Sequence, residues 1–340
     1  MDYGSVKKNR NIFVFCVIGI VGLLARECDE RRPTHITVFV HGSHGTFPTL
    51  ASLSSKMARV DEALFACPLG MWRIDDLELK NHFWTMADIL DRADPGSFPR
   101  VHYYAFGWSG QLSFMVRHLA AHRLYGELKR LIRRQQEHDG VPPILTIITH
   151  SHGGNVALNL GFFYHLDDEP SFEVDRLILL ACPVQAKTAS FVTSKLFKRI
   201  YSLHSHRDTL QVMDPQGWHS VRWRVKKAIR KGSLKPLWQK AEEVCPSFFS
   251  SRHFQPQDNL SQARVRWHHT RPWGEEDVAI FPEFRTQIAR LGSMLSMPRD
   301  LMHIEFLIPS LLKRIPEVLR GLDEDVYFPL AGTVDRYIPL

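Results

Sequence analysis

The sequence predicts an α/β fold with a mostly parallel central sheet and helices on both of its faces. Short apolar runs of strand length alternate with longer segments whose apolar residues recur every three or four positions. Strands that alternate with helices form parallel sheets, and their uninterrupted apolar composition indicates burial on both faces. Strands are expected at residues 36–40, 101–107, 144–148, 176–181 and 199–203, and residues 263–267 fit a sixth.

Three helical patterns accompany these strands. Residues 113–136 repeat apolar side chains at helical spacing and end at an Asp-Gly-Val-Pro-Pro turn. Residues 153–164 form a mostly apolar helix directly after the third strand, and residues 304–319 follow a helical pattern interrupted by Pro309 and Pro316. Residues 46–99 are mixed, with several candidate helices.

Composition predicts a globular protein with a large core. The chain has 340 residues, of which 44% are hydrophobic, and they include 21 Phe and eight Trp. We expect an N-terminal segment over residues 1–32 and one α/β domain over residues 33–340, with an insertion at about residues 213–260. The five cysteines form no CxxC pair, and the sequence has neither a P-loop nor a G-x-G-x-x-G motif. No metal and no cofactor are therefore expected.

The N-terminus carries an apolar run at residues 12–25. Basic residues precede it, and charged residues follow it at once. Its length suits the core of a signal peptide or a short uncleaved anchor, which predicts a membrane-associated or exported protein. The alternative is a helix or strand packed on the domain, and the protein would then be cytoplasmic.

The net charge of +7 comes from one segment, residues 222–240, which holds eight Lys or Arg and no acidic residue. Trp223 and Trp238 interleave with these cations. Such a segment can lie at an anionic membrane surface or act as a lid, and it can equally be a solvated insertion helix. No nucleic-acid-reading module accompanies it, so no nucleic acid partner is expected.

A serine lies on a tight turn between the strand at residues 144–148 and the helix at residues 153–164. The turn reads Thr-His-Ser-His-Gly-Gly, with Ser151 at its centre. Small residues must flank such a serine because strand and helix pack closely around it, and its hydroxyl is then exposed at the carboxyl end of the strand. The pattern predicts that Ser151 is a nucleophile.

With Val40-His41-Gly42 after the first strand, His150-Ser151-His152-Gly153-Gly154 at the turn and the order Ser, Asp, His, the chain resembles the α/β-hydrolase superfamily. The resemblance extends from about residue 36 to residue 319 and implies a serine esterase or lipase. One departure is Thr149, which stands where the superfamily usually has glycine. A β-branched residue there is expected to crowd the turn.

The resemblance also implies roles for further residues. The backbone amides of Ser43 and His152 would hold the oxyanion of the tetrahedral intermediate. Asp208, after the strand at residues 199–203, would be the acid that orients the catalytic histidine, with Asp214 as a rival. Structural alternatives are a polar turn at Ser43 and a loop cap at Asp208.

The base is the least determined member, because the chain has 18 histidines. The resemblance favours His303, since an amphipathic helix follows it directly. His268 and His269, at the end of the strand predicted at residues 263–267, are alternatives. Two further candidates that follow Asp208 are His219 and His253.

These residues predict hydrolysis of a carboxylic ester, with a lipid or another apolar acyl compound as the substrate. A thioesterase, an amidase or an acyltransferase could use the same triad. The alternative from another class is an inactive hydrolase fold that serves as a binding or scaffold protein. Trp108, after the second strand, could border the substrate pocket or simply pack against the strand end.

Overall fold

This computed structural model describes residues 33–43, 67–77, 82–205, 208, 211, 250–266, 306–307, 309–326 and 336–339. The apolar run at residues 12–25 and the basic segment at residues 222–240 lie outside these ranges, as does most of the expected insertion. Within the described ranges, no helix has the length and apolar character needed to span a membrane.

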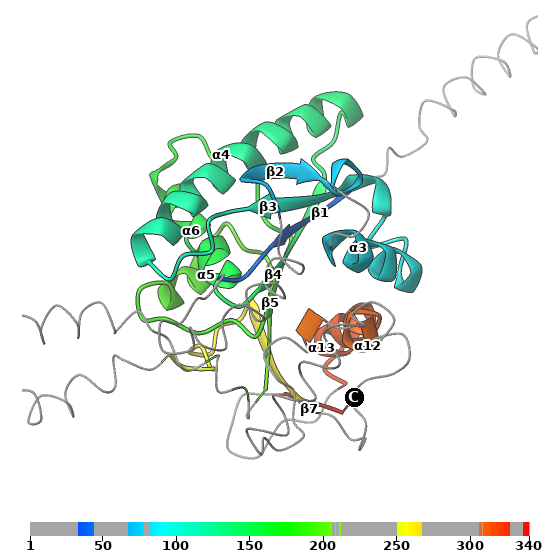
Figure 1. Cartoon of the computed structure of the whole chain (residues 1–340), viewed down its shortest axis with the longest axis vertical. Helices are drawn as coiled ribbons and strands as arrows, with labels where there is room; N and C mark the ends of the chain where they lie inside the picture. Colours follow the sequence, from blue (N-terminus) through cyan, green and yellow to red (C-terminus); the bar gives the residue numbers. More distant parts are fainter. Residues whose placement is uncertain are drawn as a thin grey trace, which may run out of the picture.

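The centre of the molecule is a sheet whose described strands are ordered β2-β3-β1-β4-β5-β6-β7-β8 (Figure 1). Neighbouring strands are parallel except at the β2 edge, where β2 and β3 are antiparallel. The strands are β1 (His35–Val40), β2 (Gly70–Arg73), β3 (Tyr103–Gly107), β4 (Ile144–His150), β5 (Arg176–Leu180), β6 (Ile200–His204), β7 (Leu260–Arg266) and β8 (Arg336–Pro339). This confirms the predicted fold class.

The six expected strands are all present, and none of their ends is shifted by more than three residues. The sequence did not predict β2 and β8, which are four residues each and lie at the two edges of the sheet. In β2 two of the four residues are exposed, so this strand lacks the apolar run that marked the central strands.

Helices cover both faces of the sheet (Figure 1). One face carries α4 (Phe114–Asp139), α5 (Gly153–Leu158) and α6 (Leu160–Leu166), and the other carries α3 (His82–Ala93), α12 (Pro309–Leu312) and α13 (Ile315–Asp323). The helix expected at residues 153–164 is two short helices that meet at Asn159. The two prolines that interrupted the last pattern lie in the first turns of α12 and α13, where proline is tolerated.

Alternation along the strands divides the core between the two faces. Val38 packs in the cluster beneath α4, α5 and α6, whereas its neighbour Phe39 packs in the cluster beneath α3, α12 and α13. Because β1, β4, β5 and β6 are parallel, their carboxyl ends meet at one edge of the sheet. Ser151 lies at this edge, directly after β4.

Candidate active site

The backbone of Ser151 is strained. Its φ is +52°, in the left-handed region that non-glycine residues rarely occupy. The Ser151 amide donates to the carbonyl of Leu180 at the end of β5 (2.9 Å), and the Ser151 carbonyl accepts from the amide of Gly154 (3.0 Å). These two hydrogen bonds hold the sharp turn between β4 and α5, and strain of this kind is a feature of functional sites. We call residues 149–154 the Ser151 elbow.

Two glycines make the elbow sterically feasible. A Cβ atom on Gly153 would lie 2.4 Å from the carbonyl oxygen of Val40 and 2.5 Å from that of His41. A Cβ atom on Gly42 would lie 2.9 Å from the Cβ atom of Ser151. The end of β1 and the elbow are therefore in contact, with no room for a side chain at either glycine.

Thr149 fits the elbow, although its β-branched side chain was expected to crowd the turn. The side chain is buried, and its Oγ1 donates to the carbonyl of Ile178 on the neighbouring strand β5 (3.2 Å). The hydroxyl of Thr149 thus makes a hydrogen bond to the neighbouring strand that a glycine at this position could not make.

Trp108 fixes the loop after β1. The His41 ring is stacked on the Trp108 ring with centroids 5.6 Å apart. The main-chain amide of Trp108 donates to Nε2 of His41 (3.0 Å), and the indole Nε1 donates to the His41 carbonyl (2.8 Å). Nδ1 of His41 donates to the carbonyl of Gly42 (2.7 Å). An amide can only donate and a carbonyl can only accept, so His41 is neutral with its proton on Nδ1. It is thus no candidate for the base. Ser43 follows as the last described residue of this loop.

His152 is the N-cap residue of α5 and is buried. Its Nδ1 lies 3.5 Å from the side-chain nitrogens of both Asn155 and Gln185. Gln185 in turn accepts a hydrogen bond from the buried Arg117 of α4 (3.1 Å). Asn155 donates to the carbonyl of Pro183 (2.9 Å). This network of buried polar side chains ties the first residue after Ser151 to α4 and to the loop after β5.

Asp208 is buried four residues after β6, at the same edge of the sheet as Ser151. Its Oδ1 accepts from the amide of Gln211 (3.1 Å), whose side chain donates to the carbonyl of Cys182 after β5 (2.8 Å). Arg252 donates to the carbonyl of Asp208 (2.6 Å) and to that of Ser205 (2.9 Å). The segment that carries the carboxylate is therefore held by a cation and an amide side chain.

Arg252 reports on the electrostatics of this region. Burial lowers its pKa, the charge of Asp208 opposes that shift, and Arg264 adds to it. Next to it, the rings of His204 and His253 are in edge-to-face contact at 4.6 Å. His204, His206 and Asp208 alternate along the sequence in a spacing that could ligate a metal, but His206 lies outside the described residues. No three metal-binding side chains come together in the part of the chain that the structure describes.

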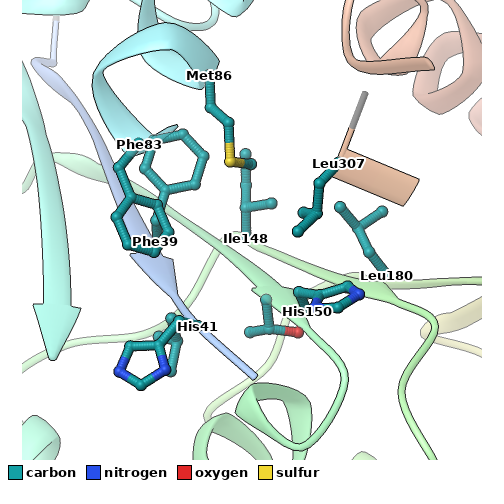
Figure 2. Close-up of a pocket in the computed structure, with 10 residues that line it drawn as sticks. Phe39, His41, Phe83, Met86, Ile148, His150, Leu180 and Leu307 are labelled. Carbon is teal, nitrogen blue, oxygen red and sulfur yellow. The ribbon is translucent and has the colours of Figure 1, made fainter. Parts of the chain in front are cut away.

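A small apolar pocket lies beside the elbow, on the face covered by α3 (Figure 2). Thr149 and His150, which precede Ser151, are part of its wall, and Figure 2 shows the His150 ring on the side of Leu180 and Leu307. The remaining lining residues come from β1 and the residue after it, from β4 and from α3: Phe39, Val40, His41, Ile148, Phe83 and Met86.

Leu307 brings the C-terminal part of the chain to this pocket. The buried His82 of α3 lies beside the Leu307 backbone, which raises the pKa of the imidazole. Burial has the larger effect and lowers the pKa of His82 to about 4. The segment at residues 306–307 thus lies beside the elbow.

Four of the five candidate bases, His303, His268, His269 and His219, lie outside the described residues, as does Asp214. The fifth, His253, is described and contacts His204. The expected residues Ser43, Ser151, His152 and Asp208 are at one edge of the sheet. Sequence reasoning missed the roles of His41 and His82. His41 and Trp108 each follow directly on one of the paired strands β1 and β3. Knowledge of that pairing would have been needed to predict their contact.

Comparison with known proteins gives one family. The PGAP1-like alpha/beta domain, an α/β-hydrolase-type family, matches residues 33–221, which is more than half of the chain. The search of curated protein sequences found no match to this chain. Among solved structures, a phospholipase PlaB from Legionella pneumophila in complex with thio-NAD is similar at 18% identity and a TM-score of 0.27. That match covers 48% of this chain and 28% of the phospholipase chain.

Proposed function

Since this chain belongs to the PGAP1-like alpha/beta domain family, we propose that it is a serine hydrolase that cleaves a carboxylic ester through Ser151. The observation that carries the proposal is the strained φ of +52° at Ser151, in a turn where Gly42 and Gly153 leave no room for side chains. A strained serine between a strand and a helix is the arrangement that exposes a nucleophile in this fold.

Asp208 is the proposed acid. One strand, β5, separates β4 from β6, so the strands that precede Ser151 and Asp208 are about 10 Å apart. An imidazole with a hydrogen bond at each nitrogen bridges much of such a gap. The buried carboxylate would keep that imidazole in one tautomer and stabilise its charged form.

His303 is the proposed base. It stands four residues before Leu307, which lines the pocket together with His150. Four residues of extended chain span at most about 14 Å, and this limit is compatible with a base at position 303 that acts at the elbow. His268 and His269 stay alternatives because they closely follow β7, which is adjacent to β6. Alanine variants of the three histidines separate them, because only loss of the true base abolishes acylation.

The proposed reaction proceeds in two stages. The Ser151 hydroxyl attacks the ester carbonyl and gives its proton to His303, while the amides of Ser43 and His152 bind the oxyanion. The alcohol leaves with the proton from His303, and the acyl group stays on Ser151. Water then attacks the acyl-enzyme, releasing a carboxylic acid and restoring the serine.

An apolar acyl group is the proposed substrate class. The pocket wall consists largely of aliphatic and aromatic side chains, and it includes the two residues that precede Ser151. We also propose that residues 12–25 and 222–240 contact a membrane, on the strength of their sequence alone. Flotation with anionic vesicles, with and without residues 222–240, tests contact through that segment. The proposal for that segment is overturned if the deletion leaves flotation unchanged.

Hydrolysis of a series of p-nitrophenyl esters tests the function. We expect cleavage of medium-chain esters by the wild type, with a loss of more than about 10³-fold in kcat for Ser151→Ala. Ser190→Ala, at an exposed position, is the matched control and should behave as the wild type. Equal activity of Ser151→Ala would overturn the proposal. Preference for thioesters, amides or added alcohol acceptors would redirect it to the related acyl chemistries. Absence of any turnover would favour a binding or scaffold protein.

A further inference from the structure

Trp108 contacts the loop after β1 through both its main chain and its side chain. It follows directly on β3, which is paired with β1, and only 4% of its surface is exposed. Its amide, its indole N–H and its ring all contact His41. His41 is followed by Gly42 and Ser43, so Trp108 restrains the residue that begins this loop.

The loop has little freedom on its other side. A Cβ atom on Gly42 would lie against the side chain of Ser151 and against the ring and carbonyl of His150. The carbonyl of Gly42 is itself hydrogen-bonded to Nδ1 of His41. The Gly42 peptide is thus held between the His41 ring and the Ser151 elbow.

From these contacts we propose that Trp108 is a positioning residue for oxyanion binding. It holds the Gly42-Ser43 backbone so that the Ser43 amide is directed at the oxygen on which charge develops. This role rests on the proposed function, because it requires an acyl intermediate on Ser151.

The two parts of Trp108 have separable effects. The main-chain amide selects the tautomer of His41, because Nε2 must accept from it. The indole N–H fixes the His41 carbonyl, which belongs to the same peptide unit as the Gly42 amide. Removing only the indole N–H therefore loosens the loop while the tautomer of His41 is retained.

Trp108→Phe is the first test, with p-nitrophenyl butyrate as the substrate. Loss of a complete oxyanion donor costs about 10²–10³-fold in kcat. A loosened donor should cost less, and we expect a fall of about tenfold in kcat with KM within about twofold. Affinity for an alkyl boronic acid, which forms a tetrahedral adduct with the serine, should fall by the same factor.

Trp72→Phe is the matched control. Its indole N–H also donates to a carbonyl, that of Leu69 at 3.3 Å, but β2 is an edge strand that β3 and β1 separate from β4. Its kcat should stay within about twofold of the wild type. If Trp108→Phe does not fold, 3-benzothienylalanine at position 108 keeps the shape of the indole and removes only the N–H.

An unchanged kcat in a folded Trp108 variant would overturn the proposal. So would a fall in kcat that leaves the affinity for the boronic acid intact, since that pattern indicates general disorder of the site. Failure of the proposed function is distinguishable, because then either Ser151→Ala would keep the activity of the wild type or the wild type itself would show no turnover. An inactive Ser151→Ala beside a fully active Trp108 variant defeats the positioning role alone.

Discussion

The two ends of the candidate site are stabilised in different ways. The Ser151 elbow is an interlock of backbone: Gly42 and Gly153 are in contact with the carbonyls and Cβ atoms opposite them. The segment of Asp208 is held instead by side chains that donate to main-chain carbonyls, chiefly Arg252. The difference teaches that the position of Ser151 depends on steric fit and that of Asp208 on hydrogen bonds, so substitutions should affect them differently.

Gly153→Ala should have the largest effect on stability. The new Cβ would be within 2.5 Å of the carbonyl oxygens of Val40 and His41, and backbone atoms cannot move aside without a large cost in energy. We expect a loss of more than about 4 kcal/mol, visible as insoluble or unfolded protein. Gly126→Ala is the control, because a Cβ there meets nothing within 4 Å and alanine favours helix α4 by about 0.5–1 kcal/mol. A soluble Gly153→Ala with an unchanged urea midpoint would refute the interlock.

Arg252→Met should disturb the acid end. It removes two charge-assisted hydrogen bonds to the carbonyls of Ser205 and Asp208, leaving partly buried oxygens without these donors. We expect a loss of about 3 kcal/mol in urea unfolding, together with reduced ester hydrolysis. Arg92→Met, whose side chain is 77% exposed in a helix ion pair, should cost less than about 1 kcal/mol. Equal stability of the two variants would contradict the comparison.

Acid should destabilise the fold through the buried His82, because protonation places a charge in the core. The folded pKa of His82 is about 4, below its ordinary value of 6.5, so the unfolded chain binds the proton more readily. The contribution of neutral His82 is complete above about pH 6.5 and is lost as the pH falls toward 4. Between pH 7 and pH 5 the free energy of unfolding should fall by about 2 kcal/mol more in the wild type than in His82→Leu. Parallel pH curves for the two proteins would show that this histidine is not the cause.

Thr149→Val should have the smallest effect. The substitution keeps the β-branched shape and removes the hydrogen bond from Oγ1 to the carbonyl of Ile178. We expect a loss of about 1 kcal/mol in thermal or urea unfolding and kcat within about threefold. A collapse of activity would mean that the hydroxyl, rather than the shape, maintains the elbow.

The same contrast explains how much the sequence could predict. The elbow was predictable because β4, Ser151 and Gly153 lie within a few residues of one another in the sequence. The apolar run of β4 and the apolar helix after it can both be recognised locally. The central strands were predictable for the same reason, whereas β2 and β8 were too short to show a pattern. The fold class is confirmed, and the assignments of the catalytic residues stay predictions.

Contacts between distant residues could not be predicted. Arg252 reaches Asp208 across 44 residues, and Trp108 reaches His41 across 67. The sequence marked Trp108 as a residue at a strand end but did not show its partner, because these contacts arise only when the folded chain brings the ends of different strands together. The base has the same difficulty, since many histidines follow Asp208 and the choice among them depends on tertiary position.

Covalent labelling of Ser151 tests the central claim most directly. The full chain is treated with a fluorophosphonate, digested and mapped by mass spectrometry. We predict a phosphonyl adduct on Ser151 that forms in the folded wild type, is absent from Ser151→Ala and is prevented by prior unfolding. An adduct on another residue, or equal labelling of Ser151→Ala, would contradict the assignment of Ser151 as the nucleophile.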